Sequence, residues 1–348
     1  MSEETDDQTI NEAALGSYLE DHIEGFEGLK QVVKFQAGQS NPTYRLDAAS
    51  GTYVLRAKPP GELLKSAHQV DREFNVMKAL AGTDVPVPKM LHLANEADSP
   101  LGRTFFVMEH LDGRIFWDPM LPEIDSDEER GAIYDAMNAA LAALHSVDVE
   151  AVGLADFGRP GNYFGRQLSR WSEQYRQSKT DEIEDMETLA AWLEENLPED
   201  DGAASLVHGD YRLDNIMFRK DKPEILAILD WELSTLGHPL ADLAYQCMQW
   251  RLPHVGSFKG LGDADRPSLG IPTEAQYVAH YCERRGLKGI DNWPFYLAFS
   301  FFRLAAILQG VFKRYTQGNA SNPEKAKSYG RSVPVIASLA VELIGKEG

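Results

Sequence analysis

Three polar side chains between residues 206 and 232 have the types and spacing of a phosphoryl-transfer site. Asp210 is followed five positions later by Asn215, and Asp230 comes after a further apolar stretch. A carboxylate can orient an attacking hydroxyl and accept its proton, while an amide oxygen and a second carboxylate are ligands that Mg²⁺ prefers. The interval from Asp210 to Asn215 equals that of the protein-kinase catalytic loop. The pattern therefore indicates phosphoryl transfer.

Short apolar strands are predicted on both sides of these residues, at 206–207, 216–218 and 225–229. The first strand leads into the polar loop and the second follows it. The third ends on Asp230, at a strand terminus from which a side chain can point into a cleft. Fixed geometry near a buried edge makes such polar groups more effective.

Further upstream, alternating apolar residues and turns predict a small antiparallel sheet. Its strands are expected at 32–35, 43–46, 52–56, 89–93 and 104–109. Ser66 and Gln69 have the spacing of a capping box, and apolar residues then recur at helical spacing up to Leu80, so a helix is predicted between the strands.

Helical patterns dominate the rest of the chain, at 133–144, 188–197, 274–285, 293–315 and 323–343. The apolar run 295–312 contains Ser300, Arg303 and Gln309. Because a charge inside a membrane span is costly, this run predicts a buried helix. Arg303 would either line a substrate cleft or, as we rather expect, form a buried ion pair. The expected class is α+β.

The chain has 348 residues, 54 acidic and 34 basic side chains, and a net charge of −20. This charge argues against nucleic acid or an anionic membrane surface as the main partner. The N-terminal residues are acidic, unlike a signal peptide, and we expect a loose tail followed by a solvated helix. Cys247 and Cys282 lie in no metal-binding pattern and are expected to be reduced thiols of a cytoplasmic protein.

Four segments together resemble the aminoglycoside phosphotransferase family, a branch of the protein-kinase-like fold. They are 38–44 (GQSNPTY), 53–56 (YVLR), 208–215 (HGDYRLDN), and 230–244, which begins DWE and ends PLADLA. The chain is most similar to the subgroup found alone or fused to acyl-CoA dehydrogenases. The resemblance implies two lobes: a sheet-rich nucleotide-binding lobe at 26–111 and a helical lobe at 112–348, preceded by an acidic segment at 1–25.

The resemblance also implies roles for residues of the second lobe. Asp210 would be the catalytic base, and Arg212 would stabilise charge on the transferring phosphoryl group. Asn215 and Asp230 would hold Mg²⁺. The structural supports of the loop would be His208 and Asp242. Relatives of this subgroup carry Asp where this chain has His238, and we expect this difference to affect local loop geometry rather than catalysis.

The implied nucleotide-binding residues are Ser40, Asn41, Arg56, Lys58, Glu73, Glu109 and Leu111. Arg56 takes the place of the kinase lysine that grips the phosphates, with Glu73 as its ion-pair partner and Lys58 as a possible helper on the same strand face. The backbone at Glu109 and Leu111 would meet the adenine edge. Ser40 and nearby amides would cover the phosphates.

The resemblance implies a kinase that transfers the γ-phosphoryl group of ATP, or of GTP, to a hydroxyl of a small molecule. Its acceptor would be a hydroxyacyl compound, including a CoA-linked one, or an amino-alcohol or aminoglycoside-like compound. The alternative is a nucleotide-binding regulator of the same fold without catalysis. Motifs of metallophosphoesterases, serine hydrolases and P-loop kinases are absent from the sequence.

Overall fold

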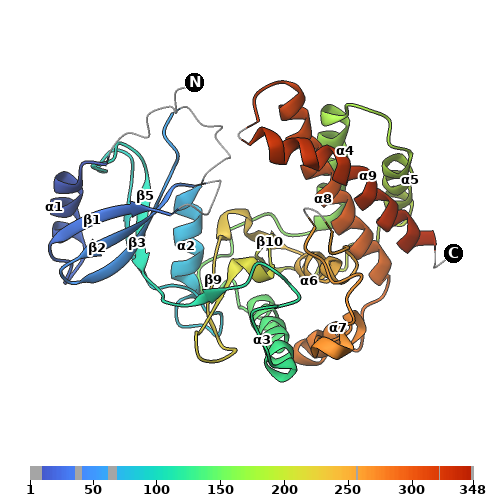
Figure 1. Ribbon diagram of the computed structural model, residues 1–348, viewed down its shortest axis with the longest axis horizontal. Coiled ribbons are helices and arrows are strands. Elements are labelled where there is room, and N and C mark those ends of the chain that lie inside the picture. Colours follow the sequence, from blue (N-terminus) through green and yellow to red (C-terminus); the bar gives the residue numbers. More distant parts are fainter. Residues whose placement is uncertain (1–9, 36–40, 62–68, 256–257, 321, 346–348) are drawn as a thin grey trace.

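The computed structural model describes residues 10–35, 41–61, 69–255, 258–320 and 322–345. These residues form a sheet-rich N-lobe and a larger, mostly helical C-lobe (Figure 1). The N-lobe sheet has five antiparallel strands in the order β1-β2-β3-β5-β4. Their bounds are Leu29–Lys34 (β1), Thr43–Ala48 (β2), Gly51–Ala57 (β3), Met90–Ala94 (β4) and Phe105–Glu109 (β5). All five predicted strands are confirmed.

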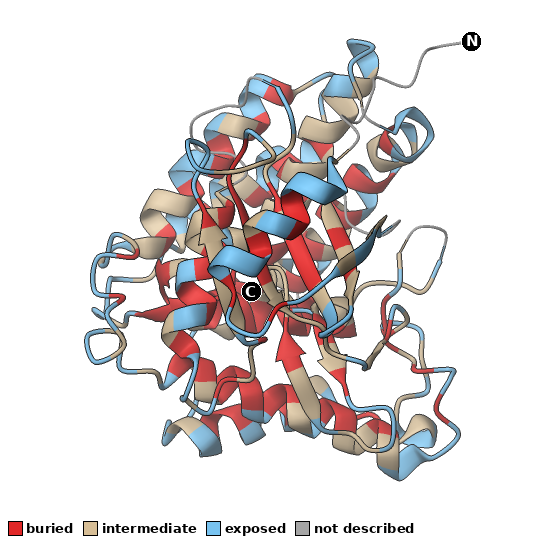
Figure 2. Cartoon of the chain, turned by 90° about the vertical axis from the view of Figure 1, so that its left-hand side faces the viewer, coloured by how far each residue is buried: buried red, intermediate tan, exposed pale blue. Residues whose placement is uncertain are grey.

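Helix α1 (Glu12–His22) is present as expected, with a solvated outer face, but its other face packs against this sheet, which was not expected. Leu15 and Leu19 on α1 are fully buried and share a core with strand residues such as Leu46 and Phe105. Exposed residues lie on the outer faces of the helices in Figure 2. The many acidic residues around α1 had concealed its apolar stripe.

Helix α2 (Val70–Leu80) contacts β4 and β5 and the short 3-10 helix Trp231–Leu233 that follows Asp230. Its N-cap is Gln69, without a side-chain capping bond. The predicted capping box was therefore wrong in its geometry, since Gln69 would have to occupy the third helical position. Ser66 lies outside the described residues.

Seven helices of the C-lobe are described: α3 (Asp127–His145), α4 (Tyr163–Ser178), α5 (Glu184–Glu195), α6 (Leu240–Cys247), α7 (Glu274–Arg285), α8 (Trp293–Thr316) and α9 (Pro323–Gly345). Two of them, α4 and α6, were not predicted. Helix α4 has a clear apolar stripe, with Phe164, Leu168, Trp171 and Tyr175 buried at helical spacing, which the sequence analysis missed among its polar residues; α6 is short and buried on nearly every side.

Short strands join the lobes and carry the polar loops. They are β6 (Arg114–Ile115), β7 (Ser205–Val207), β8 (Ile216–Phe218), β9 (Ile225–Ile228) and β10 (Thr235–Gly237). Strands β6, β8 and β9 form one small sheet, and β7 pairs with β10. The three strands predicted around the polar loop are confirmed, with β9 one residue shorter than expected.

Helix α8 is long and apolar enough to cross a membrane by length and composition, but 61% of its most apolar window is buried inside the protein. It packs along α9 and also contacts α4 and α6. The prediction of a buried helix is confirmed. Cys247 and Cys282 are free and buried, in agreement with the expected thiols.

Candidate active site

A buried carboxylate holds the backbone of the loop that carries Asp210. Asp242, in the first turn of α6, is 1% exposed and accepts hydrogen bonds from the amides of His208 (2.6 Å) and Gly209 (2.8 Å). Burial raises the pKa of Asp242, but the hydrogen bonds that it accepts, including one from His145, outweigh this and lower it. Asp242 therefore remains an anion, as a support of the loop must.

His208 links this loop to the strand that precedes Asp230. Its Nε2 lies 2.9 Å from the carbonyl oxygen of Leu229, and its Nδ1 lies 3.2 Å from the amide nitrogen of Asp210. The amide can only donate and the carbonyl can only accept, so these contacts fix the neutral tautomer with the proton on Nε2. The fully buried ring thus ties the two polar loops together.

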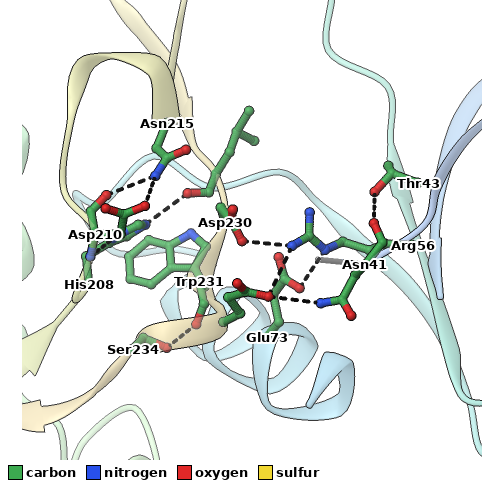
Figure 3. A network of polar contacts seen from close by, with 12 residues as sticks. Asn41, Thr43, Arg56, Glu73, His208, Asp210, Asn215, Asp230, Trp231 and Ser234 are labelled. Carbon is green, nitrogen blue, oxygen red and sulfur yellow. Dashed lines mark hydrogen bonds and ion pairs between the residues drawn. The ribbon is translucent and has the colours of Figure 1, made fainter. Parts of the chain in front are cut away.

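Asn215 and Asp210 are in direct contact (Figure 3). The Asn215 Nδ2 donates to Asp210 Oδ2 at 3.0 Å and to the Asp210 carbonyl oxygen at 2.9 Å. This orientation leaves Oδ1 of Asn215 turned away from Asp210. The amide oxygen is the atom that a hard cation would use.

Asp230 lies across from these residues, in a chain of charges that joins the lobes (Figure 3). Arg56 Nε is 2.9 Å from Glu73 Oε2, and Arg56 Nη2 is 2.7 Å from Asp230 Oδ1 and 3.9 Å from Glu232 Oε2. The expected Arg56–Glu73 ion pair is present, and Asp230 joins it. Burial and the two other carboxylates raise the pKa of Glu73 to about 7, although Arg56 acts in the opposite direction.

The donor set fits a hard cation. Three carboxyl groups surround one guanidinium here, and Asn215 lies on the neighbouring polar loop (Figure 3). Within the described ranges, no three His, Cys, Asp or Glu side chains are grouped as a complete metal cage. Few protein ligands are typical of a Mg²⁺ ion that also binds nucleotide phosphates and water.

Of the other predicted nucleotide-binding residues, the structure joins Asn41 to this cluster through Glu232 and places Lys58 apart from it. Asn41 is buried and its Nδ2 donates to Glu232 Oε2 at 3.2 Å, whereas Ser40 lies outside the described residues. Lys58 follows the end of β3 and pairs with Asp71 of α2 at 3.7 Å, rather than with the Arg56 cluster.

The expected adenine-binding backbone is partly occupied. The amide of Glu109 donates to the carbonyl oxygen of Lys89 at 3.0 Å, and Glu109 Oε1 accepts from the amide of Lys89 at 2.7 Å. The Glu109 amide is therefore committed to the pairing beside β4. Leu111, two residues past β5 and half-buried, keeps its place at the junction of the lobes.

A cleft opens beside Asp210, between α6, α8 and α9, with a volume of about 380 Å³. Its polar lining consists mainly of Asp210, Arg212, Tyr245, Arg303, Arg314 and Lys325, and its apolar wall includes Leu304, Ile307, Leu308 and Val311. Arg212 is 44% exposed and pairs with Asp214. We call this space the α6–α8–α9 cleft.

Arg303 lines this cleft, which is the less favoured of the two expectations from the sequence. It makes no ion pair within the described part of the chain, so the favoured expectation was wrong; its Nη2 instead donates to the carbonyl oxygen of Gly209 at 2.7 Å. The sequence offered a signal, a charge inside an apolar run, but not the partner, which lies 94 positions away.

His238, which departs from the expected aspartate, lies behind the site at the start of α6. Its Nδ1 accepts from the amide of Leu240 at 3.2 Å, and its ring stacks on Tyr296. Burial lowers the pKa of His238 although Asp201 opposes this, so a neutral ring is favoured. It contacts the helix that carries Asp242, not the polar loops themselves.

A family model described as "Phosphotransferase enzyme family" matches residues 31–270 of the chain. The chain belongs to the phosphotransferase enzyme family. The matched residues include both polar loops, the Arg56 strand and α6, whereas α8 and α9, which form much of the cleft, lie beyond them.

Relatives of this phosphotransferase-family chain include parts of longer proteins. Mouse acyl-CoA dehydrogenase family member 10 is 47% identical over 338 residues, which are 95% of this chain and 31% of that protein. The probable acyl-CoA dehydrogenase IBR3 of Arabidopsis thaliana is 42% identical over 354 residues, 96% of this chain and 43% of that protein. The chain thus spans less than half the length of these relatives.

Solved structures show the same fold. A candidate aminoglycoside phosphotransferase from Ralstonia eutropha JMP134 is 47% identical, with a TM-score of 0.88 over 96% of this chain and 98% of that one. Spectinomycin phosphotransferase, solved with ADP and spectinomycin, is 14% identical, with a TM-score of 0.62 over 97% and 99% of the two chains. The kinase-like fold of this phosphotransferase-family chain is established by these likenesses.

Proposed function

We propose that the chain is an ATP-dependent kinase that transfers the γ-phosphoryl group to a hydroxyl of a small molecule. The observation that carries this proposal is the meeting of Asp210, Asn215 and Asp230 with the Arg56–Glu73 ion pair at the junction of the lobes. Supporting it, a relative of the same fold was solved with AMP-PNP and hygromycin B. The residue types gathered here are those that phosphoryl transfer needs.

Each residue then has a definite task. Asp210 orients the acceptor hydroxyl and accepts its proton as the oxygen attacks the γ-phosphorus, and the bond to the ADP oxygen breaks. Asn215 Oδ1 and the Asp230 carboxylate would hold Mg²⁺, which when bound offsets charge on the phosphate oxygens. Arg56, oriented by Glu73, binds the remaining phosphates. Arg212 lies where it can stabilise the transferring group.

The charge of the α6–α8–α9 cleft favours an anionic acceptor. Arg212, Arg303, Arg314 and Lys325 face one carboxylate, Asp210, across an otherwise apolar wall. A second hollow of about 490 Å³ shares Arg212, Tyr245 and Lys325 with it and extends the space available. These features support a hydroxyacyl acceptor, free or CoA-linked, over a cationic aminoglycoside. Relatives of this chain form part of longer proteins that are named acyl-CoA dehydrogenases, which also supports a hydroxyacyl acceptor.

An acceptor screen tests this function. The chain is incubated with ATP and Mg²⁺ and a panel of hydroxy acids, hydroxyacyl-CoAs, sugars and aminoglycosides, and ADP release and phosphorylated product are measured. We expect product with an anionic hydroxy compound and a loss of about 100-fold or more in Asp210→Asn, which retains the shape of the base but not its proton affinity.

The alternative, a nucleotide-binding regulator, predicts a different outcome. A regulator would bind MgADP both as wild type and as Asp210→Asn, and its wild type would show no turnover with any acceptor of the panel. Product formation that is equal in wild type and Asp210→Asn would contradict the role of Asp210 alone. We also propose a cytoplasmic location, since both cysteines are free thiols.

A further inference from the structure

Arg303 is a charged residue in the middle of an apolar helix. Between Trp293 and Phe312 it is the one ionisable side chain of the Asp, Glu, Lys, Arg and His types on α8. No carboxylate lies within ion-pair distance of it among the residues the structure describes, although a half-buried charge is costly without compensation. Its position therefore calls for a partner of another kind.

That partner is the catalytic loop. Arg303 Nη2 donates to the carbonyl oxygen of Gly209 at 2.7 Å, a charge-assisted hydrogen bond. The guanidinium carbon also lies 5.7 Å from the ring centroid of Trp171 on α4 and 5.4 Å from that of Tyr245 on α6. Three elements thus fix the guanidinium, which the aromatic faces stabilise by cation–π attraction.

The bond from Arg303 completes the support of a single peptide unit, the one between Gly209 and Asp210. Its oxygen is held by Arg303, and its nitrogen, the amide of Asp210, faces His208 Nδ1 at 3.2 Å. Gly209 has φ +84°, and a Cβ there would lie 2.6 Å from the carbonyl oxygen of Leu233. The backbone that sets the direction of Asp210 is therefore fixed at each polar atom.

We propose that Arg303 is a positioning residue of the transfer reaction, which acts through the Gly209 carbonyl to set the position of the Asp210 carboxylate. This inference rests on the proposed kinase function. The guanidinium of Arg303 also lines the α6–α8–α9 cleft. One side chain therefore both supports the base and forms part of the wall that contacts the acceptor. A displacement of the base by about 1 Å is enough to reduce the rate about 100-fold.

The test separates positioning from folding and from nucleotide binding. ADP release from ATP and Mg²⁺, with water as the acceptor, is measured for wild type, Arg303→Met, Arg303→Lys and the control Lys313→Met, which changes a cation on the same helix outside the cleft. The binding of MgADP and the thermal unfolding midpoint are measured for each. We expect Arg303→Met to lose about 30- to 100-fold in kcat with the KM for ATP unchanged, Arg303→Lys to recover part of this, and the control to match wild type.

Two results would overturn the inference while leaving the kinase function intact. One is a kcat of Arg303→Met within threefold of wild type; the other is a loss that appears in MgADP affinity or in the unfolding midpoint instead of kcat. If Arg303→Met does not fold, the test uses Arg303→Lys. A folded Arg303→Lys protein with wild-type kcat contradicts the proposal, and a folded one whose kcat is about tenfold lower supports it. A wild type without turnover, with water or with any acceptor of the panel, overturns the proposed function and this inference together.

Discussion

The pKa of the Glu73 side chain is set by its burial and by the charged groups around it. It is 2% exposed and faces Arg56, with Asp230 and Glu232 close behind that guanidinium. Burial favours the protonated carboxyl group, the two other carboxylates favour it further, and Arg56 favours the charged form. The balance puts the pKa of Glu73 at about 7, well above the ordinary value of 4.5.

This pKa predicts a pH dependence of stability that Glu73→Gln removes. A raised pKa means that the folded protein holds the proton more tightly than the unfolded chain does. The stabilisation is therefore complete below pH 4.5 and is lost as the pH rises through 7. Urea unfolding between pH 5 and 8 should show the wild type losing stability relative to Glu73→Gln. A difference that stays constant or grows with pH would contradict this.

The site could be predicted from the sequence where its residues follow one another closely. Asp210, Asn215 and Asp230 lie on adjoining loops of short strands, and their spacing was sufficient to bring them together. Arg303 could not be placed in this way, because its partner is a backbone carbonyl on a distant loop. The pairing of Lys58 with Asp71 could not be predicted either, because Lys58 lies just beyond the end of β3 and so does not share the strand face of Arg56.

Among the elements, the long helices of the last quarter of the chain were predicted well, whereas α4 was missed despite its apolar stripe. Helix α7 has the predicted bounds, and α8 differs from its prediction by one residue at its end. Helix α1 was expected, but its role was misjudged because charges around it outnumber the apolar residues of its buried face. Burial of that face is what makes α1 part of the N-lobe.

Shortening one buried side chain of α1 should test this role. Leu19→Ala leaves a cavity in the N-lobe core, and we expect the free energy of unfolding to fall by about 2–5 kcal/mol. Ser17→Ala, on the exposed side of the same helix, is the control and should change stability little. Denaturant unfolding of both variants gives the comparison. Equal stability of Leu19→Ala and wild type would mean that α1 contributes little to the fold.

At the scale of the whole molecule, charge is distributed unevenly. The chain has a net charge of −20, yet the α6–α8–α9 cleft presents several cations beside Asp210. Arg314 and Lys325 are among them, one near the end of α8 and the other in the first turn of α9. An anionic ligand would thus be repelled by the molecule as a whole and attracted at this cleft, which makes the local cations decisive.

Replacing Arg314 and Lys325 should therefore weaken the binding of the acceptor without changing the KM for ATP. We expect Arg314→Gln with Lys325→Gln to raise the KM for an anionic acceptor at least tenfold, about 1.4 kcal/mol of binding. The KM for ATP should stay constant. Lys313→Gln, outside the cleft, is the matched control. Steady-state kinetics with the acceptor found by the screen decide the matter, and an unchanged acceptor KM would rule out anion binding by these side chains.

The ion pair between Arg56 and Asp230 has a consequence for the pace of the catalytic cycle. The carboxylate of Asp230 is paired with the same guanidinium that we propose binds the phosphates. The protein thus contains its own competitor for the nucleotide. On the proposed function, ATP must displace the Asp230 carboxylate from Arg56 when it binds. When ADP leaves, Asp230 pairs with Arg56 again, so the guanidinium is not left without a counter-charge. A kinase of the kind we propose would thereby give up some affinity for its nucleotide and release its product faster.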